Sequence, residues 1–365
     1  MGPALNLPRL LFGAGSLARL PGELTLLGVE RPMLVADRGV ERAGLLAGVA
    51  GTAARFLDVP ENPTAAGADG AAAAYRAAGC DGVVALGGGS VLDTAKIVAA
   101  LVGSGVARAD ALIGRPERIH QVAPLIAIPT TVGTGSESSP VAALHLVAGG
   151  PGIGTRHPFL TPRVAICDPE LARTLPRRLI AATAIDALSH CVEGFFAEPA
   201  NPIADALALD GAARVFADVR AALEPGGDAA CASLMAAAFA GGAAIGKGLG
   251  PAHAIALACA DQDAHHGTLI GVALPRTTRL LAAHRPGRAA RLRAAIGLTP
   301  DADLGDALAR LIATLGLPAT LADAGYRVDD AERLADDMAR SHFNRTSPYA
   351  PTRDEYRRLL DAIAA

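Results

Sequence analysis

The sequence predicts an α/β N-terminal domain with a parallel sheet, followed by an all-helical C-terminal domain. Three observations support this prediction. The chain has 365 residues, which suits two domains, and its first half alternates short apolar runs with Ala-rich helical stretches. Its second half is mostly long Ala/Leu helical pattern broken by prolines. Because strands separated by helices favour a parallel sheet covered on both faces, we expect domains at 1–165 and 166–365.

The composition excludes several classes of protein. With 51% hydrophobic residues and a net charge of −3, the chain is too apolar and too weakly charged to be disordered. It has no run of Lys and Arg, which argues against nucleic acid and anionic membranes as partners. Its five cysteines form no CxxC pair, and residues 1–30 lack a secretion pattern, so we expect a cytoplasmic protein with reduced thiols. The uncharged stretch between Asp228 and Lys247 is dominated by Ala and Gly, which favours an internal helix over a membrane span.

Three apolar runs in the first half are predicted strands, and each ends in polar or glycine-rich residues. They cover residues 32–36, 82–86 and 125–128, with helical stretches at 68–79 and 91–102. In the second half, helical pattern is interrupted at Pro202, Pro225, Pro251, Pro286 and Pro318.

The second predicted strand runs into Gly87-Gly88-Gly89-Ser90 and then into a helix. Glycines let a ligand approach the backbone and tolerate positive φ, and the N-terminus of the following helix suits a pyrophosphate. Asp93 and Lys96 fall in the first two turns of that helix. The alternative is a glycine-rich turn with Ser90 as an ordinary helix cap. The segment is not a GxGxxG fingerprint, so it predicts a phosphate cradle only through its position between strand and helix.

The other two strand ends also carry candidate cofactor residues. Asp37 closes the first strand, where an acidic side chain can bond the adenosine ribose hydroxyls, although Asp-Arg-Gly is also good turn chemistry. The third strand leads into Pro129–Glu137, which contains Thr130, Thr131 and Thr134 with two glycines. Hydroxyl and N–H donors around a flexible turn suit phosphate or nicotinamide amide groups; the alternative is a polar surface loop.

Asp186 and His190 stand four residues apart in an apolar helical stretch, so they share one helix face. A buried carboxylate needs a partner, which would be His190 alone or a metal ion. His253 and His266 add two further candidate ligands, and one Asp with three His would suit Fe²⁺, Zn²⁺ or a similar ion. His265 is a candidate outer partner. The other histidines have no such context and are expected on the surface or in loops (His120, His145, His157, His284 and His342).

The order of these motifs along the chain resembles the iron-containing (group III) alcohol dehydrogenase family. GGGSVLDTAK at 87–96, PTTVGTGSE at 129–137, Asp168-Pro169-Glu170-Leu171 and IDALSHCVE at 185–193 precede the two late histidine segments, and the likeness spans about 8–360. It implies a nucleotide-binding domain, a helical metal-binding domain and a site in the cleft between them. By motif position it implies metal ligands at Asp186, His190, His253 and His266. It implies cofactor contacts within the first domain (Asp37, Gly87, Gly88, Gly89, Ser90, Asp93, Thr130, Thr131 and Thr134), with Asp37 favouring NAD over NADP.

The chain departs from the family pattern in three places. Leu257 stands where relatives often carry a histidine that is a candidate proton relay, and the spacing from His253 to His266 is one residue shorter than usual. Water, the cofactor ribose, Asp263 or His265 would then have to move the proton. The tail Phe343–Tyr349 replaces an Asn-Pro-Arg type of segment.

The resemblance implies hydride transfer between NAD(H) and a small alcohol, aldehyde or ketone, with one Fe²⁺ or Zn²⁺ acting on the substrate oxygen. It also implies a homodimer or larger homo-oligomer. Enzymes like maleylacetate reductase or glycerol and glycerol-phosphate dehydrogenases are alternatives, as is a non-catalytic nucleotide-binding relative. The GTGSE and DAxxH motifs argue against the related dehydroquinate-synthase type of cyclase.

Overall fold

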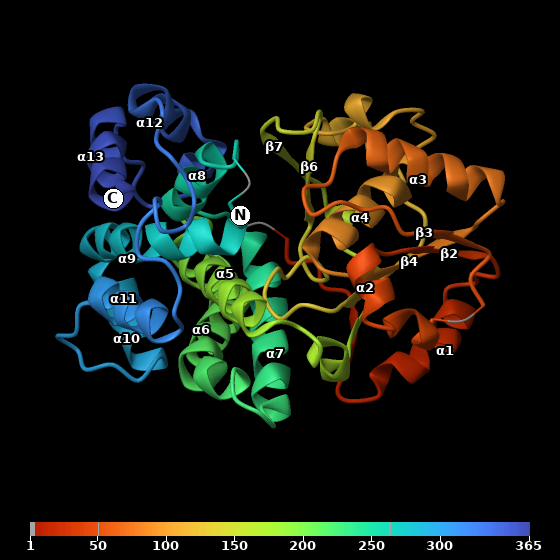
Figure 1. Ribbon diagram of the computed structural model, residues 1–365, viewed down its shortest axis with the longest axis horizontal. Coiled ribbons are helices and arrows are strands. Elements are labelled where there is room, and N and C mark those ends of the chain that lie inside the picture. Colours follow the sequence, from red (N-terminus) through yellow and green to blue (C-terminus); the bar gives the residue numbers. More distant parts are fainter. Residues whose placement is uncertain (1–3, 50, 263) are drawn as a thin grey trace. The chain divides into compact units, whose positions relative to one another are not determined.

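The computed structural model describes residues 4–49, 51–262 and 264–365, which fall into two compact units (Figure 1). The α/β unit consists of Asn6–Thr131 and Gly135–Leu175, and the helical unit consists mainly of Pro176–Ala365 with Val132–Thr134. The expected boundary at residue 165 falls inside a strand that pairs with the sheet of the α/β unit. This unit therefore extends to Leu175.

The α/β unit is built on a six-stranded parallel sheet in the order β1-β8-β5-β4-β2-β3, which confirms the predicted fold class. The sheet consists of β1 (Arg9–Phe12), β2 (Pro32–Val35), β3 (Ala54–Phe56), β4 (Gly82–Gly87), β5 (Leu125–Pro129) and β8 (Val164–Cys167). The chain moves outward from β2 to β3 and then returns to the other side of β2 with β4. The carboxyl ends of β2 and β4 therefore flank a point where the strand order reverses, which is where ligands bind in open α/β sheets.

Alternate residues of the central strands enter two different cores, as expected for a sheet covered on both faces. Met33 and Val83 pack with α3 (Ala65–Ala77) and α4 (Gly89–Gly103), whereas Leu34 and Val84 pack in a second core with α1 (Leu20–Leu26) and α2 (Arg38–Arg42). Strands β2 and β4 and helices α3 and α4 lie where the apolar runs and Ala-rich stretches predict them, whereas α1 and α2 have no counterpart among the predicted elements.

The sequence does not reveal the shorter elements of this unit. Strands β1, β3 and β8 have three or four residues, and the antiparallel pair of β6 (Val141–His145) and β7 (Gly152–Arg156) adds a small second sheet. Asp168, just after β8, accepts hydrogen bonds from the backbone N–H groups of Gly15 and Leu17. The Asp-Pro-Glu segment thus fastens the turn that follows β1 to the sheet.

The helical unit contains nine α-helices and, in its described residues, no strand. They are α5 (Arg177–Phe196), α6 (Pro202–Ala222), α7 (Asp228–Ile245), α8 (Pro251–Ala258), α9 (His266–His284), α10 (Pro286–Ala295), α11 (Leu304–Thr314), α12 (Ala331–Arg340) and α13 (Arg353–Ala364). Pro202, Pro251 and Pro286 each occupy a first helical position, where the missing N–H costs nothing. Of the five prolines predicted to interrupt the helical pattern, the other two, Pro225 and Pro318, follow the ends of α6 and α11.

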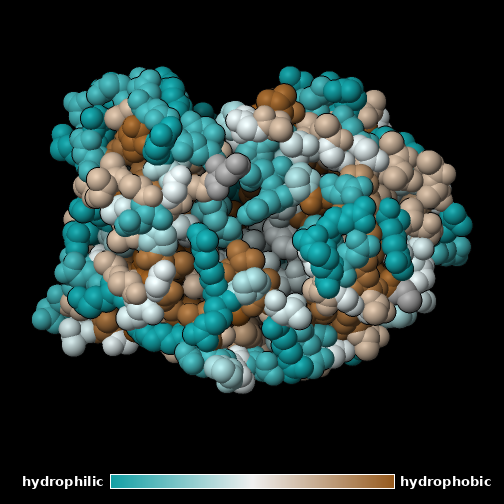
Figure 2. All heavy atoms as spheres, in the orientation of Figure 1, coloured by the Kyte–Doolittle hydropathy of each residue, from teal (hydrophilic) through white to brown (hydrophobic). Residues whose placement is uncertain are grey.

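Helices α5, α6 and α7 pack closely because small residues lie at their contacts. A Cβ atom on Gly211 would lie 2.6 Å from Cys191 Sγ, and one on Gly241 would lie 3.0 Å from His190 Cβ. Both α5 and α7 are long and apolar enough to cross a membrane by length and composition, but 94% and 72% of their apolar windows are buried within the protein. The face in Figure 2 is mainly hydrophilic, with hydrophobic residues in limited patches.

Candidate functional site

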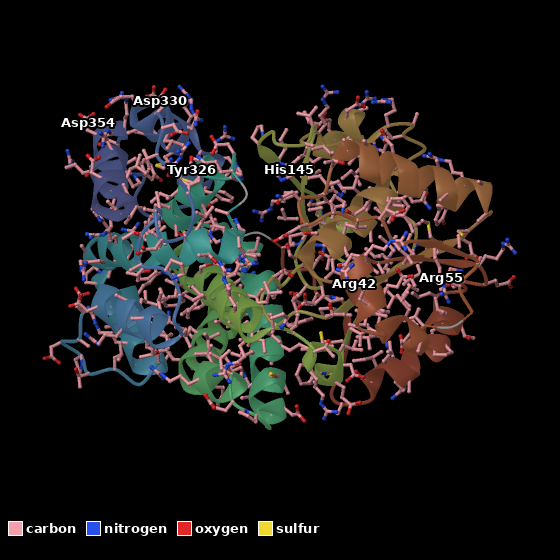
Figure 3. The ribbon with its side chains drawn as sticks, in the orientation of Figure 1. Arg42, Arg55, His145, Tyr326, Asp330 and Asp354 are labelled. Atoms are coloured by element: carbon pink, nitrogen blue, oxygen red, sulfur yellow. The ribbon has the colours of Figure 1, made fainter. Side chains whose placement is uncertain are left out.

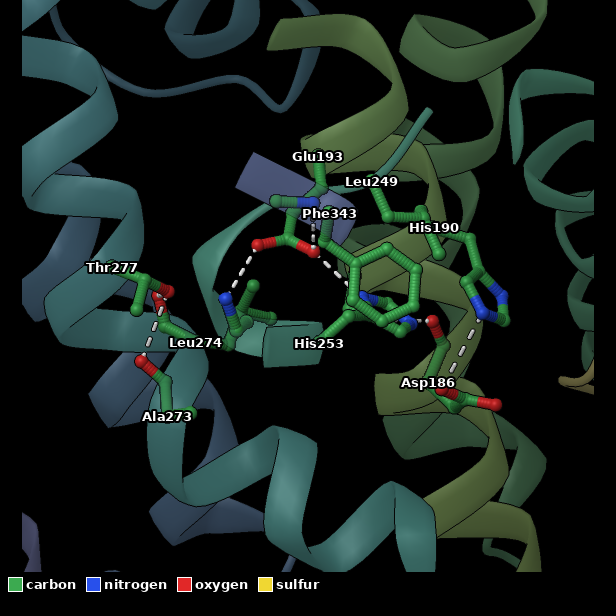
Figure 4. A network of polar contacts seen from close by, with 12 residues as sticks. Asp186, His190, Glu193, Leu249, His253, Ala273, Leu274, Thr277 and Phe343 are labelled. Carbon is green, nitrogen blue, oxygen red and sulfur yellow. Dashed lines mark hydrogen bonds and ion pairs between the residues drawn. The ribbon is translucent and has the colours of Figure 1, made fainter. Parts of the chain in front are cut away.

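Helix α5 carries three buried ionisable residues on one face of an apolar helix. Asp186, His190 and Glu193 follow the spacing i, i+4 and i+7, so their side chains point the same way. Nε2 of His190 lies 3.6 Å from Oδ1 of Asp186 (Figure 4). All three residues are at most 6% exposed.

Glu193 connects α5 to the start of α8. Its carboxylate accepts hydrogen bonds from the backbone N–H groups of Gly250 (3.0 Å) and Ala252 (2.7 Å) and lies 2.6 Å from Nδ1 of His253 (Figure 4). A carboxylate at a helix N-terminus is favoured by the helix dipole. A carboxylate beside Nδ1 places the imidazole proton on that nitrogen, so Nε2 of His253 keeps a lone pair for a ligand.

His266, the first residue of α9, completes a compact group. Its Nε2 lies 3.8 Å from Oδ1 of Asp186, and one ligand atom from each of Asp186, His253 and His266 falls within 4.8 Å of the other two. The His253 ring lies 5.0 Å from the His190 ring and 5.7 Å from the His266 ring, between centroids. Two atoms bound to one tetrahedral zinc ion lie about 3.4 Å apart, so the spacing is close to what an ion needs.

The electrostatics of this group suit a divalent cation. Burial raises the pKa of Asp186 to about 7, a rise that nearby His253 opposes. Burial and the neighbouring His253 hold the pKa of His190 well below its usual range. The pKa of His266 is also lowered, by the loss of solvent around its ring and by nearby His253, although half of its side chain is exposed. The imidazoles of His190 and His266 are therefore neutral and offer lone pairs. Oδ1 of Asp186 and Nε2 of His253 are buried without a hydrogen-bond partner, a costly arrangement that a bound cation would relieve.

Two residues of this site are absent from the candidates drawn from the sequence. Glu193 lies in the IDALSHCVE motif, and its i+7 spacing from Asp186 on an apolar helix is a signal that could have identified it. Phe343 packs its ring 5.6 Å from that of His253. It comes from the tail, in the 3₁₀ turn η7 (His342–Arg345), and no local pattern predicts that contact.

The structure describes the position of the missing relay histidine and one of the two side chains that could replace it. Leu257 is half-buried on α8, one turn beyond His253. His265 is the N-cap residue of α9, directly before the candidate ligand His266. Asp263 lies outside the described residues.

The glycine loop after β4 leaves a helix N-terminus available. Gly88 is the N-cap residue of α4 and supplies no side-chain cap, and the Ser90 hydroxyl donates to the carbonyl of Glu61 instead of capping the helix. One expectation needs correction, because none of Gly87, Gly88 and Gly89 has positive φ. Gly87 and Gly88 are required by space: added Cβ atoms would lie 2.6 Å from Val91 Cγ2 and 3.1 Å from Thr131 Cγ2.

Asp93 holds the segment that follows the threonine loop. Its Oδ1 accepts the Ser136 hydroxyl at 2.6 Å, and its Oδ2 accepts the N–H of Ala143 at 2.8 Å. Nζ of buried Lys96 lies 3.8 Å from Asp93 and donates to the carbonyls of Ser139 and Val141. Both oxygens of Asp93 thus bind protein, and a direct cofactor contact by Asp93 stays a prediction.

The remaining cofactor candidates lie at the ends of β2 and β5. Asp37 caps α2, because its carboxylate accepts a hydrogen bond from the N–H of Val40 at 2.8 Å. The turn role is therefore present, and the ribose contact predicted for the same carboxylate stays a prediction. Thr130 donates its N–H to Gly87, which joins the two loops, and the Thr131 hydroxyl is buried without a hydrogen-bond partner. Thr134 belongs with the helical unit, as does Gly133, where a Cβ would lie 1.9 Å from the Thr183 carbonyl.

Glu137, at the end of the threonine loop, should make folding stability depend on pH. Burial raises its pKa from an ordinary 4.5 to about 7, so the folded protein holds this proton more tightly than the unfolded chain. The resulting stabilisation is present below about pH 4.5 and is lost as the pH rises through about 7. Glu137→Gln should remove that loss, which amounts to about 3 kcal/mol at most.

Denaturant unfolding at about pH 5 and pH 8 tests this, with Glu117→Gln, an exposed glutamate of the same unit, as the control. The wild type and the control should lose more stability than Glu137→Gln between the two pH values. Equal losses in all three proteins would show that Glu137 does not titrate in this range.

Comparison with known proteins identifies the chain's relatives. The model of iron-containing alcohol dehydrogenases matches residues 8–169, and that of the C-terminal domain of the Fe-containing alcohol dehydrogenase family matches 180–364. The 4-hydroxybutyrate dehydrogenase of Cupriavidus necator is 39% identical over 369 residues, covering 96% of each chain. The probable alcohol dehydrogenase EutG of Escherichia coli is 34% identical, over 87% of this chain and 83% of that protein.

Solved structures of similar proteins superpose on the whole of this chain. A 1,3-propanediol oxidoreductase superposes with a TM-score of 0.92 at 26% identity, covering all of both chains. The sulfoacetaldehyde reductase of Bifidobacterium kashiwanohense, solved in complex with NAD⁺, gives a TM-score of 0.89 at 26% identity and covers 100% of this chain and 99% of that one. The chain is thus an alcohol oxidoreductase and belongs to the iron-containing alcohol dehydrogenase family.

Proposed function

We propose that this protein is an NAD-dependent enzyme that interconverts small alcohols and aldehydes with the help of one divalent ion, Fe²⁺ or Zn²⁺. The convergence of Asp186, His253 and His266 on one point, with unpartnered buried ligand atoms, carries this proposal. His190 is the fourth proposed ligand, because its Nε2 lies beside the Asp186 carboxylate. The set contains only oxygen and nitrogen atoms, which both ions accept.

A bound ion would supply Lewis acidity toward a substrate oxygen. The chain's own residues prepare the place for it. Glu193 keeps the proton of His253 on Nδ1 and directs Nε2 inward. Phe343 covers the His253 ring, which limits access of water to that side. Leu257 has no titratable group, so water, the cofactor ribose, Asp263 or His265 would have to move the proton.

The nucleotide is proposed to bind the α/β unit at the carboxyl ends of β2, β4 and β5. The free N-terminus of α4 suits its pyrophosphate, and the unpartnered Thr131 hydroxyl beside Gly88 offers a polar contact to the cofactor. We expect Asp37 to bond the ribose hydroxyls and to repel a 2′-phosphate. Relatives that act on 4-hydroxybutyrate and on sulfoacetaldehyde make short substrates with an anionic end the first to test.

Maleylacetate reductase is a second candidate activity. An enzyme of that name from Pseudomonas aeruginosa is 31% identical over 90% of this chain. For either activity we propose a cytoplasmic homo-oligomer; the five free cysteines support the reducing compartment.

Elemental analysis and cofactor oxidation together test the proposed function. We expect about one Fe or Zn per chain and loss of NADH absorbance with short aldehydes, among them succinic semialdehyde and sulfoacetaldehyde. Maleylacetate serves as the competing substrate.

NADH should be used more efficiently than NADPH, because Asp37 would face the 2′-phosphate. Equal or better efficiency with NADPH would refute the role of Asp37, and the absence of turnover with every substrate would favour a non-catalytic protein.

Asp186→Ala and His266→Ala should each abolish metal binding and turnover while leaving the fold intact, because each removes a ligand atom from the compact group. Asp210→Ala is the matched control, since Asp210 is an exposed aspartate on α6 of the same unit. Metal content, turnover and circular dichroism would be measured for all three variants. A ligand variant that kept both its metal and its rate would show that the site is assigned wrongly.

Glu193→Gln should weaken metal binding about 10- to 100-fold, the usual effect of losing a carboxylate behind a ligating histidine. An amide has one acceptor oxygen, whereas the Glu193 carboxylate serves His253 and two backbone N–H groups. Titration of the ion-free protein with Zn²⁺ measures the change, with Glu198→Gln, an exposed glutamate paired to Arg285, as the control. Unchanged affinity would mean that Glu193 only caps α8.

A further inference from the structure

We propose that five residues outside the ligand set position His266 and thereby determine how long the ion stays bound. They are Asp261, Gln262, Tyr326, Arg327 and Arg333, here called the loop clamp. Asp261 and Gln262 lie in the connection between α8, which carries His253, and α9, which begins with His266. This inference rests on the proposed metal site.

The loop clamp uses every polar atom of two adjacent side chains. The Tyr326 hydroxyl donates to Oδ1 of Asp261 and Arg333 Nη2 donates to Oδ2, both at 2.8 Å. Gln262 Nε2 donates to the Arg327 carbonyl at 2.8 Å, and the Arg327 N–H donates back to Gln262 Oε1 at 3.1 Å. A reciprocal pair of this kind fixes the orientation of the amide as well as its position.

One partner of the clamp is itself rigidly held. Tyr326, labelled in Figure 3, is 1% exposed and is among the largest fully buried side chains, so its ring is fixed by packing. Only its hydroxyl reaches Asp261. The connection between the two ligand-bearing helices is therefore tied to a side chain that belongs to the core.

His266 depends on this connection more than the other candidate ligands do. Its side chain is 50% exposed, whereas those of Asp186 and His253 are at most 9% exposed, so packing constrains it less. It is the first residue of its helix, and no side-chain cap fixes that helix end. Packing of α9 on α5, where a Cβ on Gly267 would lie 2.4 Å from the Ala182 carbonyl oxygen, holds the start of the helix, and the connection that precedes His266 adds to this constraint.

Residues 326–343, which contain three of the clamp residues, also reach the candidate ligand His253. Arg333 lies on α12, which packs on α8, and α12 is followed by η7 with Phe343 against the His253 ring. Residues 326–343 thus hold both His253 and the connection to His266. Loss of the loop clamp should therefore allow His266 to move relative to His253.

This arrangement predicts an effect on metal retention that is larger than the effect on stability. Asp261 and Arg333 are 38% and 46% exposed, and pairs with such exposure add little to global stability. A ligand that moves by a fraction of an ångström, by contrast, weakens a multidentate site directly. Partners that orient ligands typically change metal affinity 10- to 100-fold.

The test follows release of Zn²⁺ from the Zn²⁺-loaded full-length protein to a chromogenic chelator. Tyr326→Phe removes one hydroxyl and keeps the ring, and Gln262→Ala removes the reciprocal pair. We expect about tenfold faster release in each variant. The melting temperature of the ion-stripped protein should stay close to that of the wild type. Arg214→Met, which breaks an exposed ion pair on α6, is the control and should release Zn²⁺ at the wild-type rate.

Wild-type release rates in both clamp variants would overturn the inference, as would a fall in melting temperature without faster release. Either result leaves the proposed function standing, provided that the wild type binds one Zn²⁺ per chain. If the wild type binds no Zn²⁺, the proposed function fails first and the inference fails with it.

Discussion

The burial of one carboxylate inside a bundle of apolar helices is the constraint on which the helical unit depends. Asp186 lies on α5, where 17 of the 20 residues are buried, and its Oδ1 has no hydrogen-bond partner. An isolated ionised carboxylate is unstable there, so the pKa of Asp186 rises to about 7. The neutral imidazoles of His190 and His266 beside it add lone pairs and no charge. A cation shared among these groups, as proposed, would offset the cost of burying the carboxylate.

Much of the surrounding packing serves to bring these groups together. Helix α5 can lie against α6 and α7 because Gly211 and Gly241 leave room for Cys191 and for the Cβ of His190. Gly133 likewise rests on the backbone of α5 at Thr183. Part of the Ala- and Gly-rich composition, which at first excludes only disorder, is thus explained by close approach of backbones. Glu193 adds the polar link that directs His253 toward Asp186.

The sequence predicts the features that depend on the local periodicity of apolar and polar residues. It locates β2, β4 and β5, the helices between them, and the Asp186–His190 pair at its i+4 spacing. It does not predict contacts that depend on distant segments. Glu193 meets His253 across 60 residues, Asp261 meets Tyr326 across 65, and Phe343 reaches His253 from the tail. The reason for Gly87 and Gly88 is also tertiary, since neighbouring side chains and not backbone φ require them.

X-ray absorption at the metal edge of the purified, metal-loaded protein tests the central claim most directly. The account predicts a first shell of nitrogen and oxygen only, with the outer-shell scattering of at least two imidazoles, because all four proposed ligands are Asp or His and the cysteines lie elsewhere. A sulfur atom in the first shell, or the absence of imidazole scattering, would contradict it.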